Sequence, residues 1–416
     1  MKKFIESGKV FGDIIAPASK SMMQRAVACA VLAKGETILN HPSTSEDALA
    51  SLHVAECLGA KVERTVDQVR IYPRKKEICN TLHCKEAGLC VRMFAPICAL
   101  WNEPMTLTGE GSLLKRPMDM VEDSLKELHV SVALENRRLP MTIQGPLLGG
   151  NTIVDGSQSS QFLTGLLLAL PCAPKASRVR VMNLKSRPYM EMTLDIIKEF
   201  GGTIFQEEDD VFEIPGGEQY RSRSYEVEGD FSGAAFLLVA GAIAGDVKVK
   251  RLKMPSLQAD SRILEVLKNI GANVEIQSTF VRVQKNRLNA FQVDATDCPD
   301  LFPPLVTLAS YCEGTSVIKG ADRLKNKESN RGIVLQTEFQ KFGIELKIDN
   351  DVMKITGGKG SAATIDSYND HRIAMAAAVF ALGLPPKEGV EILNAECVKK
   401  SYPRFYNDID QLRVRM

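Results

Sequence analysis

Polar and basic residues gather at the starts of several segments that are otherwise apolar. In the first, Ser19-Lys20-Ser21-Met22-Met23-Gln24-Arg25, Ser21 and Arg25 are four residues apart and would share one face of a helix. Three more starts of this kind are Ser157-Gln158-Ser159-Ser160-Gln161, Cys298-Pro299-Asp300 and Tyr368-Asn369-Asp370-His371-Arg372. A helix N-terminus offers free N–H groups and the positive end of a dipole, so it attracts anions. Together these starts predict a site for phosphate and carboxylate groups.

A second set of helix starts adds positive charge. It consists of Lys115-Arg116-Pro117, Ser186-Arg187-Pro188-Tyr189, Lys327-Glu328-Ser329-Asn330-Arg331 and Lys400-Ser401-Tyr402-Pro403. Helix capping would explain Ser or Asp at any single start. It does not explain Lys20, Arg25 or Arg372 beside apolar helices, because long charged side chains are rarely buried without a partner. A substrate with several negative groups would be that partner.

An internal repeat must position these residues. A helix-period stretch with an apolar end, usually followed by glycine, recurs from Leu58-Gly59-Ala60 to Phe342-Gly343-Ile344 at steps of 70, 72, 70 and 72 residues. Glycine is the expected helix stop, and β-type sequence follows each copy. Six apolar helices interleave with this series, at Ser19–Leu32, Glu86–Leu100, Ser157–Leu170, Asp230–Ala244, Pro299–Tyr311 and Asn369–Leu382.

The repeat predicts the fold class. Each copy corresponds to strand–helix–strand–helix followed by a hairpin, a βαβαββ unit of an α/β protein. The chain ends before a sixth hairpin, so we expect the N-terminal segment Lys2–Ile15 to complete the last repeat. Six repeats would form two similar domains of three, residues 18–229 and residues 230–416 together with 1–17.

The composition is that of a globular protein with more than one domain. Of 416 residues, 44% are hydrophobic and 25% are charged, and 52 Lys plus Arg against 51 Asp plus Glu leave a net charge of +1. Binding to nucleic acid or to an anionic membrane normally needs a basic excess, so neither partner is expected. The first fifteen residues lack a signal-peptide core, and the longest apolar stretches fall short of the about 20 residues of a membrane helix.

Ten cysteines without a signal sequence predict a cytoplasmic protein whose thiols are reduced and mostly buried. Cys79 and Cys84 are five residues apart, with His83 beside Cys84. No second pair completes a zinc-binding set, so no metal is expected.

In their order along the chain, these residues resemble the 5-enolpyruvylshikimate-3-phosphate (EPSP) synthases, or 3-phosphoshikimate 1-carboxyvinyltransferases, of the enolpyruvyl transferase family. The likeness extends from Ala18 to Pro403. Its motifs are Ser19-Lys20-Ser21 with Arg25, Arg116-Pro117, the run from Gly156 to Thr164, Ser186 with Tyr189, Pro299-Asp300, Lys327-Glu328 with Arg331, Asn369-Asp370-His371-Arg372, and Lys400. Each motif alone is weak, whereas all of them in one order are specific.

The resemblance implies an inside-out α/β barrel, with three βαβαββ units in each of two domains and the active site in the cleft between them. It implies transfer of the enolpyruvyl group of phosphoenolpyruvate to the 5-hydroxyl of shikimate 3-phosphate. The products would be 5-enolpyruvylshikimate 3-phosphate and phosphate, in the shikimate pathway to chorismate and the aromatic amino acids. No metal, no organic cofactor and a monomeric state are also implied.

The resemblance assigns residues by position. Shikimate 3-phosphate would be bound by Lys20, Ser21, Arg25, Ser159, Ser160, Gln161, Ser186, Tyr189, Asp300, Arg323 and Lys327. Phosphoenolpyruvate would be bound by Lys20, Gly88, Arg116, Gln161, Arg331, Arg372 and Lys400. Asp300 would take the proton of the 5-hydroxyl, and Glu328 with Lys20 would donate a proton to the methylene carbon.

Some positions depart from the family's pattern. Glu86-Ala87-Gly88-Leu89 stands where Asn-Ala-Gly-Thr is usual, so a carboxylate is added and a hydroxyl is lost near the expected phosphate contact. Arg323 occupies a place often held by Asn, and Asn330 a place usually held by Asp. An altered affinity for phosphoenolpyruvate is the hypothesis that follows.

Two other functions stay open at this point. One is the related enolpyruvyl transferase that acts on UDP-N-acetylglucosamine and uses a catalytic Cys. Cys90 would suit it, but Cys90 lies inside an apolar helix, Ser21 stands where that enzyme usually has Asn, and the enzyme lacks the run Asp370-His371-Arg372. The other is a non-catalytic relative that binds a sugar phosphate. The residues that argue against it are Lys20, Asp300 and Glu328.

Overall fold

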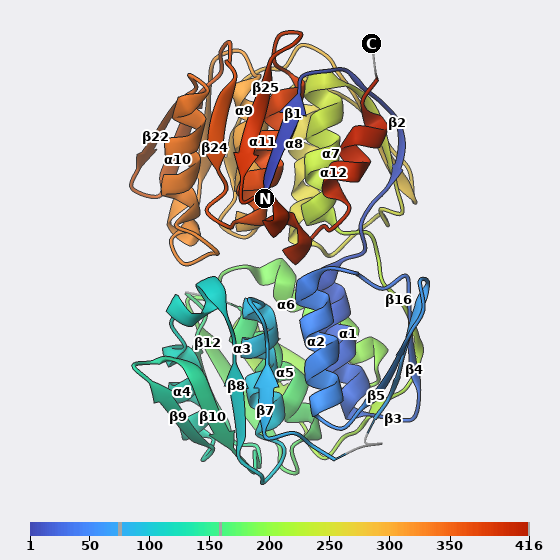
Figure 1. Cartoon of the computed structure of the whole chain (residues 1–416). Helices are drawn as coiled ribbons and strands as arrows, with labels where there is room; N and C mark the ends of the chain where they lie inside the picture. Colours follow the sequence, from blue (N-terminus) through green and yellow to red (C-terminus); the bar gives the residue numbers. More distant parts are fainter. Residues whose placement is uncertain (74–76, 158–159, 415–416) are drawn as a thin grey trace. The chain divides into compact units, whose positions relative to one another are not determined.

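The chain folds into two compact units, called domain I and domain II below. Domain I is Ala18–Val227, and domain II combines Met1–Pro17 with Glu228–Met416. The structure is a computed structural model that describes residues 1–73, 77–157 and 160–414 (Figure 1). The chain therefore passes from one domain to the other twice, after Pro17 and after Val227.

Domain I contains three four-stranded sheets of one design. In each sheet two strands run parallel, and a hairpin adds two antiparallel strands at one side. Their bounds are β16 (Ser224–Glu226), β4 (Thr37–Asn40), β6 (Gln68–Tyr72) and β5 (Lys61–Arg64); β7 (Thr81–His83), β8 (Met105–Thr108), β10 (Arg138–Gln144) and β9 (Ser131–Glu135); β11 (Asn151–Asp155), β12 (Ser177–Met182), β14 (Val211–Ile214) and β13 (Phe205–Glu208). A short parallel pair, β3 (Ala33–Lys34) with β15 (Tyr220–Arg221), is separate from them.

Domain II repeats the design. Two of its sheets have four strands and the third has three. Their bounds are β2 (Val10–Ile15), β17 (Gly245–Lys250), β19 (Phe280–Gln284) and β18 (Asn273–Ile276); β20 (Gln292–Asp294), β21 (Thr315–Lys319), β23 (Val352–Thr356) and β22 (Glu345–Asp349); β24 (Ala363–Asp366), β25 (Gly389–Leu393) and β1 (Lys2–Glu6). The predicted α/β class with repeated βαβαββ units is confirmed.

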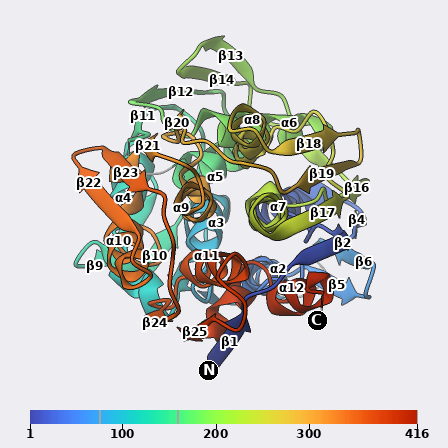
Figure 2. The same ribbon diagram turned by 90° about the horizontal axis from the view of Figure 1, so that it is seen from above.

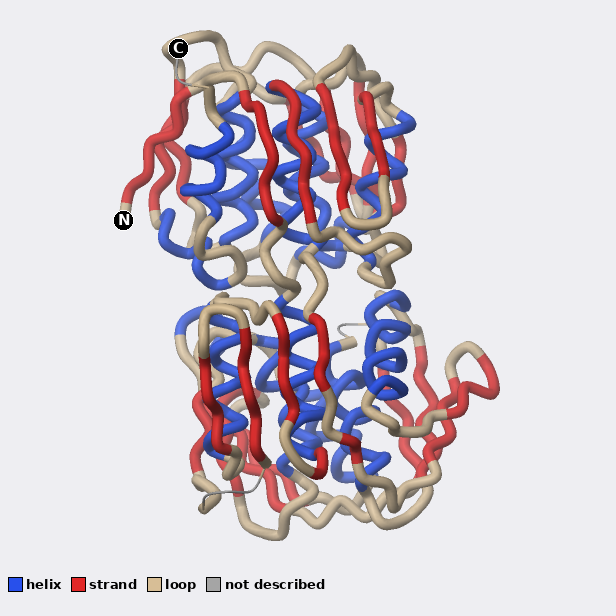
Figure 3. Tube along the Cα trace, turned by 90° about the vertical axis from the view of Figure 1, so that its right-hand side faces the viewer, coloured by secondary structure: helices blue, strands red, loops and turns tan. Residues whose placement is uncertain are grey.

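The six predicted apolar helices form the centres of the domains. They are α1 (Lys20–Leu32), α3 (Gly88–Cys98) and α5 (Gln161–Ala169) in domain I, and α7 (Phe231–Ala244), α9 (Phe302–Ser310) and α11 (His371–Leu382) in domain II. In α7 only Ser232 is not buried, as expected for a helix that is apolar on all sides. Figure 2 shows α7, α9 and α11 side by side in the middle of domain II, with sheet strands around them. Figure 3 shows the strands of each domain lying outside these helices.

Six more helices follow the second strand of each repeat. They are α2 (Glu46–Cys57), α4 (Asp119–Glu127), α6 (Arg187–Glu199), α8 (Ile263–Asn269), α10 (Arg331–Lys341) and α12 (Phe405–Leu412). Short 3₁₀ turns are η1 (Gly111–Lys115), η2 (Leu170–Cys172), η3 (Ala259–Arg262), η4 (Pro299–Leu301), η5 (Ala321–Leu324) and η6 (Ala395–Lys400). Among the helices of the described ranges, none has the length and hydropathy required to cross a membrane.

The prediction for the N-terminal segment was only half right. β1 does complete the last repeat, because it pairs antiparallel with β25. β2 instead pairs parallel with β17 and supplies the leading strand of the fourth repeat. Gly245 permits this approach, since a Cβ there would lie 1.9 Å from the carbonyl oxygen of Val10. The length of the N-terminal segment predicts that extra strands are present. Which sheet each strand joins depends on tertiary packing.

Candidate active site

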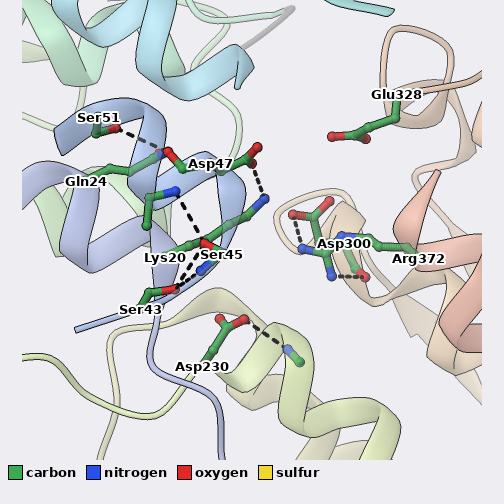
Figure 4. Close-up of polar contacts among 12 residues, drawn as sticks. Lys20, Gln24, Ser43, Ser45, Asp47, Ser51, Asp230, Asp300, Glu328 and Arg372 are labelled. Carbon is green, nitrogen blue, oxygen red and sulfur yellow. Dashed lines mark hydrogen bonds and ion pairs between the residues drawn. The ribbon is translucent and has the colours of Figure 1, made fainter. Parts of the chain in front are cut away.

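The start of α1 carries an ion pair. Ser19 caps the helix, and Lys20 Nζ lies 2.6 Å from Asp47 Oδ2, with both side chains 15% exposed (Figure 4). Asp47 lies in the first turn of α2, whose N-cap is Ser45. Sequence reasoning placed Lys20 at a site but missed Asp47, although the acidic start Ser45-Glu46-Asp47 was a visible signal. Lys20 is thus oriented by a partner on the neighbouring helix.

Arg25 is buried between three helices of domain I. Its Nε donates to Thr193 Oγ1 at 2.9 Å, and Nη1 donates to the carbonyl of Ser21 at 2.8 Å. Nη2 is 3.3 Å from Thr164 Oγ1 and 3.5 Å from the carbonyl of Tyr189. Burial lowers the pKa of Arg25 to about 10, because these neutral oxygens replace water only in part. The side chain links α1 to α5 and α6 and retains its positive charge at neutral pH.

The start of α3 is crowded by arginines. A Cβ on Gly88 would lie 2.7 Å from Arg116 Nη1, 3.1 Å from Arg92 Nη1 and 3.5 Å from Gln161 Oε1. Arg92 Nη1 donates to Gln161 Oε1 at 2.8 Å, and Nη2 donates to the carbonyl of Pro117 at 3.2 Å. A side chain at position 88 would displace the Arg116 guanidinium, and two guanidinium groups lie beside the first turn of α3. Sequence reasoning missed Arg92, whose signal was a charge four residues after Gly88 in an apolar helix.

Two other helix starts of domain I were predicted to bind substrate. Ser160 is buried immediately before α5, whereas Ser159 lies outside the described residues. Ser186 is buried immediately before α6 and has φ +59°, a left-handed conformation that is strained for a residue with a Cβ. Tyr189 follows in the first turn, and its carbonyl accepts hydrogen bonds from Thr193 and Arg25. The structure thus brings Arg25, Tyr189 and Ser186 into one region of domain I.

Domain II gathers opposite charges around Arg331 at the start of α10. The guanidinium is fully buried, and its Nε and Nη2 donate to Asp370 Oδ2 and Oδ1 at 2.9 and 3.2 Å. Nη1 donates to Asp300 Oδ1 at 3.0 Å and Nη2 to Glu328 Oε2 at 2.5 Å. Burial alone would lower the pKa of Arg331, but the three carboxylates outweigh it and hold the pKa well above its usual value.

Asp300 lies in η4 and accepts hydrogen bonds from two arginines. Arg372 Nη2 lies 3.0 Å from its Oδ2, and Lys327 Nζ lies 3.5 Å from its Oδ1. Figure 4 draws the contact between Asp300 and Arg372. Burial would raise the pKa of Asp300, but Arg372, Lys327 and Arg331 hold it well below its usual range. Burial lowers the pKa of Lys327, and the charge of Asp300 offsets this in part. Asp300 is therefore a carboxylate that is ionised at neutral pH.

The remaining predicted residues of domain II lie close to this cluster or on neighbouring turns. Arg372 is buried in the first turn of α11. Burial alone would lower its pKa, but the charges of Asp300, Asp260 and Asp230 together raise it. Lys400 is buried at the end of η6 and donates to the carbonyl of Asn369 at 2.8 Å. Arg323 lies in η5, and its charge is among those that lower the pKa of Lys327.

Asp370 and Asp260 are buried carboxylates of domain II that were not among the predicted site residues. Asp370 caps α11 by accepting from the Arg372 N–H at 3.0 Å, while also pairing with Arg331. Asp260, in η3, accepts from Ser232 Oγ. Burial, with the nearby charge of Asp300, raises the pKa of Asp260 to about 7. Asp370 was part of a predicted helix start but had no assigned role, and Asp260 was not singled out in the sequence.

The predicted site residues are divided between the domains. Lys20 and Glu328, expected to act together as proton donor, belong to domain I and domain II respectively. Cys90 is fully buried in α3, which confirms its prediction as a core residue. In residues 1–73, 77–157 and 160–414, no group of three or more His, Cys, Asp or Glu side chains is placed to hold a metal ion.

Comparison with known proteins identifies the family. Residues 5–409 match the family model described as EPSP synthase (3-phosphoshikimate 1-carboxyvinyltransferase). The chain belongs to this family. It is 35% identical over 419 residues to a 3-phosphoshikimate 1-carboxyvinyltransferase of Clostridium perfringens, with 99% of this chain and 98% of that protein covered. A protein of the same name from Thermococcus kodakarensis is 35% identical over 404 residues, covering 97% of this chain and 98% of its own.

Two solved structures share the fold of this chain. An EPSP synthase from Acinetobacter baumannii has a TM-score of 0.80 and 25% sequence identity, covering 99% of this chain and 98% of its own. The enolpyruvyl transferase NikO from Streptomyces tendae has a TM-score of 0.79 at 15% identity, covering 99% of this chain and 97% of its own. The two-domain α/β architecture expected from the repeat is therefore that of the family.

Proposed function

We propose that the protein transfers the enolpyruvyl group of phosphoenolpyruvate to the 5-hydroxyl of shikimate 3-phosphate and releases phosphate. The reaction belongs to the shikimate pathway, which leads to chorismate and the aromatic amino acids. The observation that carries the proposal is Asp300, a carboxylate kept ionised between Arg372, Arg331 and Lys327. An ionised carboxylate can accept the hydroxyl proton, and the cations around it suit two anionic substrates.

In this mechanism the ion pairs of Asp300 change when substrate binds. Arg331 and Arg372 now neutralise Asp300, which makes it a weak base. Phosphoenolpyruvate carries a phosphate and a carboxylate, which would draw these guanidinium groups toward themselves. As the cations move away, the pKa of Asp300 rises toward its usual value and the carboxylate becomes a better proton acceptor.

Protonation of the methylene carbon is assigned to Glu328 with Lys20. Glu328 is held by Arg331 Nη2 at 2.5 Å, so it is oriented by the same residue that contacts Asp300. Lys20 is oriented by Asp47. Arg331 therefore positions both the base and one of the acids, in addition to its assigned contact with phosphoenolpyruvate.

The other assigned residues would bind the two anions. Shikimate 3-phosphate would be bound by Arg25, Tyr189 and the serines at the starts of α5 and α6. Buried cations and hydroxyls can bind its phosphate and hydroxyl groups. Gly88, with Arg116 beside it, favours phosphoenolpyruvate at the start of α3. The monomeric state and the cytoplasmic location stay predictions.

One assay separates the proposal from its two rivals. The purified full-length protein is incubated with phosphoenolpyruvate and either shikimate 3-phosphate or UDP-N-acetylglucosamine, and released phosphate is measured. Release only with shikimate 3-phosphate is the expected result. Release only with the UDP sugar would support the related transferase, and no release with either acceptor would favour a binding protein.

A further inference from the structure

Glu86 lies two residues before α3, where a carboxylate is unexpected beside an anion site. Its Oε2 accepts hydrogen bonds from the backbone N–H and the hydroxyl of Ser112, at 3.1 and 2.9 Å. Gly111, with φ +58°, lies against the same carboxylate: a Cβ there would be 2.5–2.7 Å from its carbon and two oxygens. The main chain at 111–112 therefore packs closely against the Glu86 carboxylate and donates a hydrogen bond to it.

Ser112 connects the Glu86 carboxylate to Arg116. The Ser112 hydroxyl donates its single hydrogen to Glu86, which leaves its oxygen free to accept from Arg116 Nη2 at 3.3 Å. The other terminal nitrogen of that guanidinium, Nη1, is the atom that would lie 2.7 Å from a Cβ on Gly88. Hydrogen bonds thus lead from Glu86 through Ser112 to Arg116, whose Nη1 lies beside the first residue of α3.

The negative charge of Glu86 also affects the N-terminal end of α3. Because Glu86 precedes the first turn of α3, it stabilises the positive end of the helix dipole. An anionic ligand at that helix end competes for the same positive potential, so the carboxylate lowers its affinity. Glu86 therefore has two separable effects, one through hydrogen bonds and one through charge.

We infer that Glu86 is a positioning residue that holds Arg116 through Ser112, and that its negative charge weakens the binding of phosphoenolpyruvate at the start of α3. This inference rests on the proposed function. The residue would set how tightly the second substrate, and the phosphate product that shares its chemistry, are held. It is not a catalytic residue, because it acts through Arg116.

Three variants separate the two effects. Glu86→Gln keeps an oxygen that can accept from Ser112 but removes the charge, so the KM for phosphoenolpyruvate should fall about three- to tenfold. Ser112→Ala keeps the charge but removes the link to Arg116, so the KM should rise about three- to tenfold. Glu86→Ala removes both, so its KM should lie above that of Glu86→Gln. In all three variants kcat should stay within about twofold.

Glu110→Gln is the matched control. Glu110 is a nearby carboxylate in domain I, more than half exposed, and lies 4.0 Å from His83. Its removal should leave the KM unchanged, because a solvated charge is screened. Equal effects of Glu110→Gln and Glu86→Gln would show a general charge effect and would overturn the inference. So would an unchanged or raised KM in Glu86→Gln, or an unchanged KM in Ser112→Ala.

A binding measurement keeps this test independent of turnover. Equilibrium dialysis with radiolabelled inorganic phosphate should show tighter binding to Glu86→Gln and weaker binding to Ser112→Ala than to the unsubstituted protein. If the unsubstituted protein shows no turnover while phosphate binding changes in these directions, the proposed function fails and the inference about Glu86 stands. If turnover is present but the KM and the affinity for phosphate are unchanged in both variants, the inference alone fails.

Discussion

The two domains hold their buried cations in different ways. In domain II, Arg331, Arg372 and Lys327 face Asp300, Glu328 and Asp370, so positive and negative charges nearly balance. In domain I, Arg25 is held by hydroxyl and carbonyl oxygens, and Arg92 donates to an amide and a carbonyl oxygen. Lys20 of domain I differs from Arg25, because it pairs with Asp47.

This difference has a consequence for substrate binding. A cation held by neutral groups keeps its full attraction for an anion, so Arg25 is suited to attract a phosphate without loss of an ion pair. In domain II an arriving anion must compete with carboxylates that are already in place. In the proposed mechanism this exchange would raise the basicity of Asp300 only when substrate is present.

The largest expected effect is the loss of turnover in Asp300→Asn. Without a proton acceptor at the centre of the domain II cluster, kcat should fall about 10²- to 10⁴-fold. Steady-state phosphate release with saturating phosphoenolpyruvate and shikimate 3-phosphate measures it. The control is Asp322→Asn, which removes an exposed carboxylate paired with Lys325 in domain II and should leave kcat unchanged. A kcat within threefold of the unsubstituted protein would remove Asp300 from its role.

The comparison of the domains predicts unequal losses of stability. Arg331→Met leaves three carboxylates without their shared cation, so the free energy of unfolding should fall by about 3–5 kcal/mol. Arg25→Met leaves only neutral oxygens and should cost about 1–3 kcal/mol. Urea denaturation of both variants measures the difference. Equal losses would show that the carboxylates around Arg331 do not increase the free-energy cost of its removal.

Arg287→Met provides a surface reference for these two variants. Arg287 pairs with Glu313 through largely exposed side chains. Removing such a pair should cost less than about 1 kcal/mol.

Asp260→Asn tests the charge balance of domain II through pH. Burial and Asp300 raise the pKa of Asp260 from an ordinary 3.8 to about 7. Between these values the unfolded chain has lost the proton and the folded chain retains it, so ionisation of Asp260 destabilises the fold as pH rises from 4 to 7. The total is up to about 4 kcal/mol.

The variant lacks this dependence. Its free energy of unfolding, relative to the unsubstituted protein, should therefore increase from pH 4 to pH 7 and level off above that. Denaturation series at several pH values measure the trend. A difference that is constant over this range would contradict the raised pKa.

The smallest expected effect concerns the start of α3 in domain I. Leu89 is partly buried against the domain I core, in the first turn that carries Gly88. Leu89→Thr adds a hydroxyl there, which should lower the KM for phosphoenolpyruvate about two- to fivefold. Leu89→Val is the matched control, because valine has nearly the same shape as threonine but lacks the hydroxyl. If Thr and Val behave alike, or if neither changes the KM, the lost hydroxyl has no bearing on affinity.

Features that depend on near neighbours in the chain could be predicted. The helix ends, mostly followed by glycine, recur at steps of 70 and 72 residues. Six apolar helices with polar starts interleave with them, and the structure has helices at both sets of positions. Helix capping and hydrophobic burial act over a few residues, so they leave a local signal. For this reason the amino-acid sequence alone is enough to place Lys20, Asp300 and Arg372 at helix starts.

Contacts between distant parts of the chain could not be predicted. Asp47 reaches Lys20 across 27 residues, and Asp300 reaches Arg372 across 72. Ser112 reaches Glu86 across 26 residues, from a turn that showed no sign of a role. Each of these pairs depends on how helices and turns pack, and many sequences with the same periodicity would pack differently.

The sequence by itself determined the repeat, the fold class and the types of residue at each helix start, because these follow from periodicity and local chemistry. Only the tertiary structure decided that β2 joins β17, that Arg331 is shared by three carboxylates and that Glu86 is linked to Arg116. The physical reason is that charge balance depends on distances of a few ångströms between groups far apart in the chain. Those distances are set by packing.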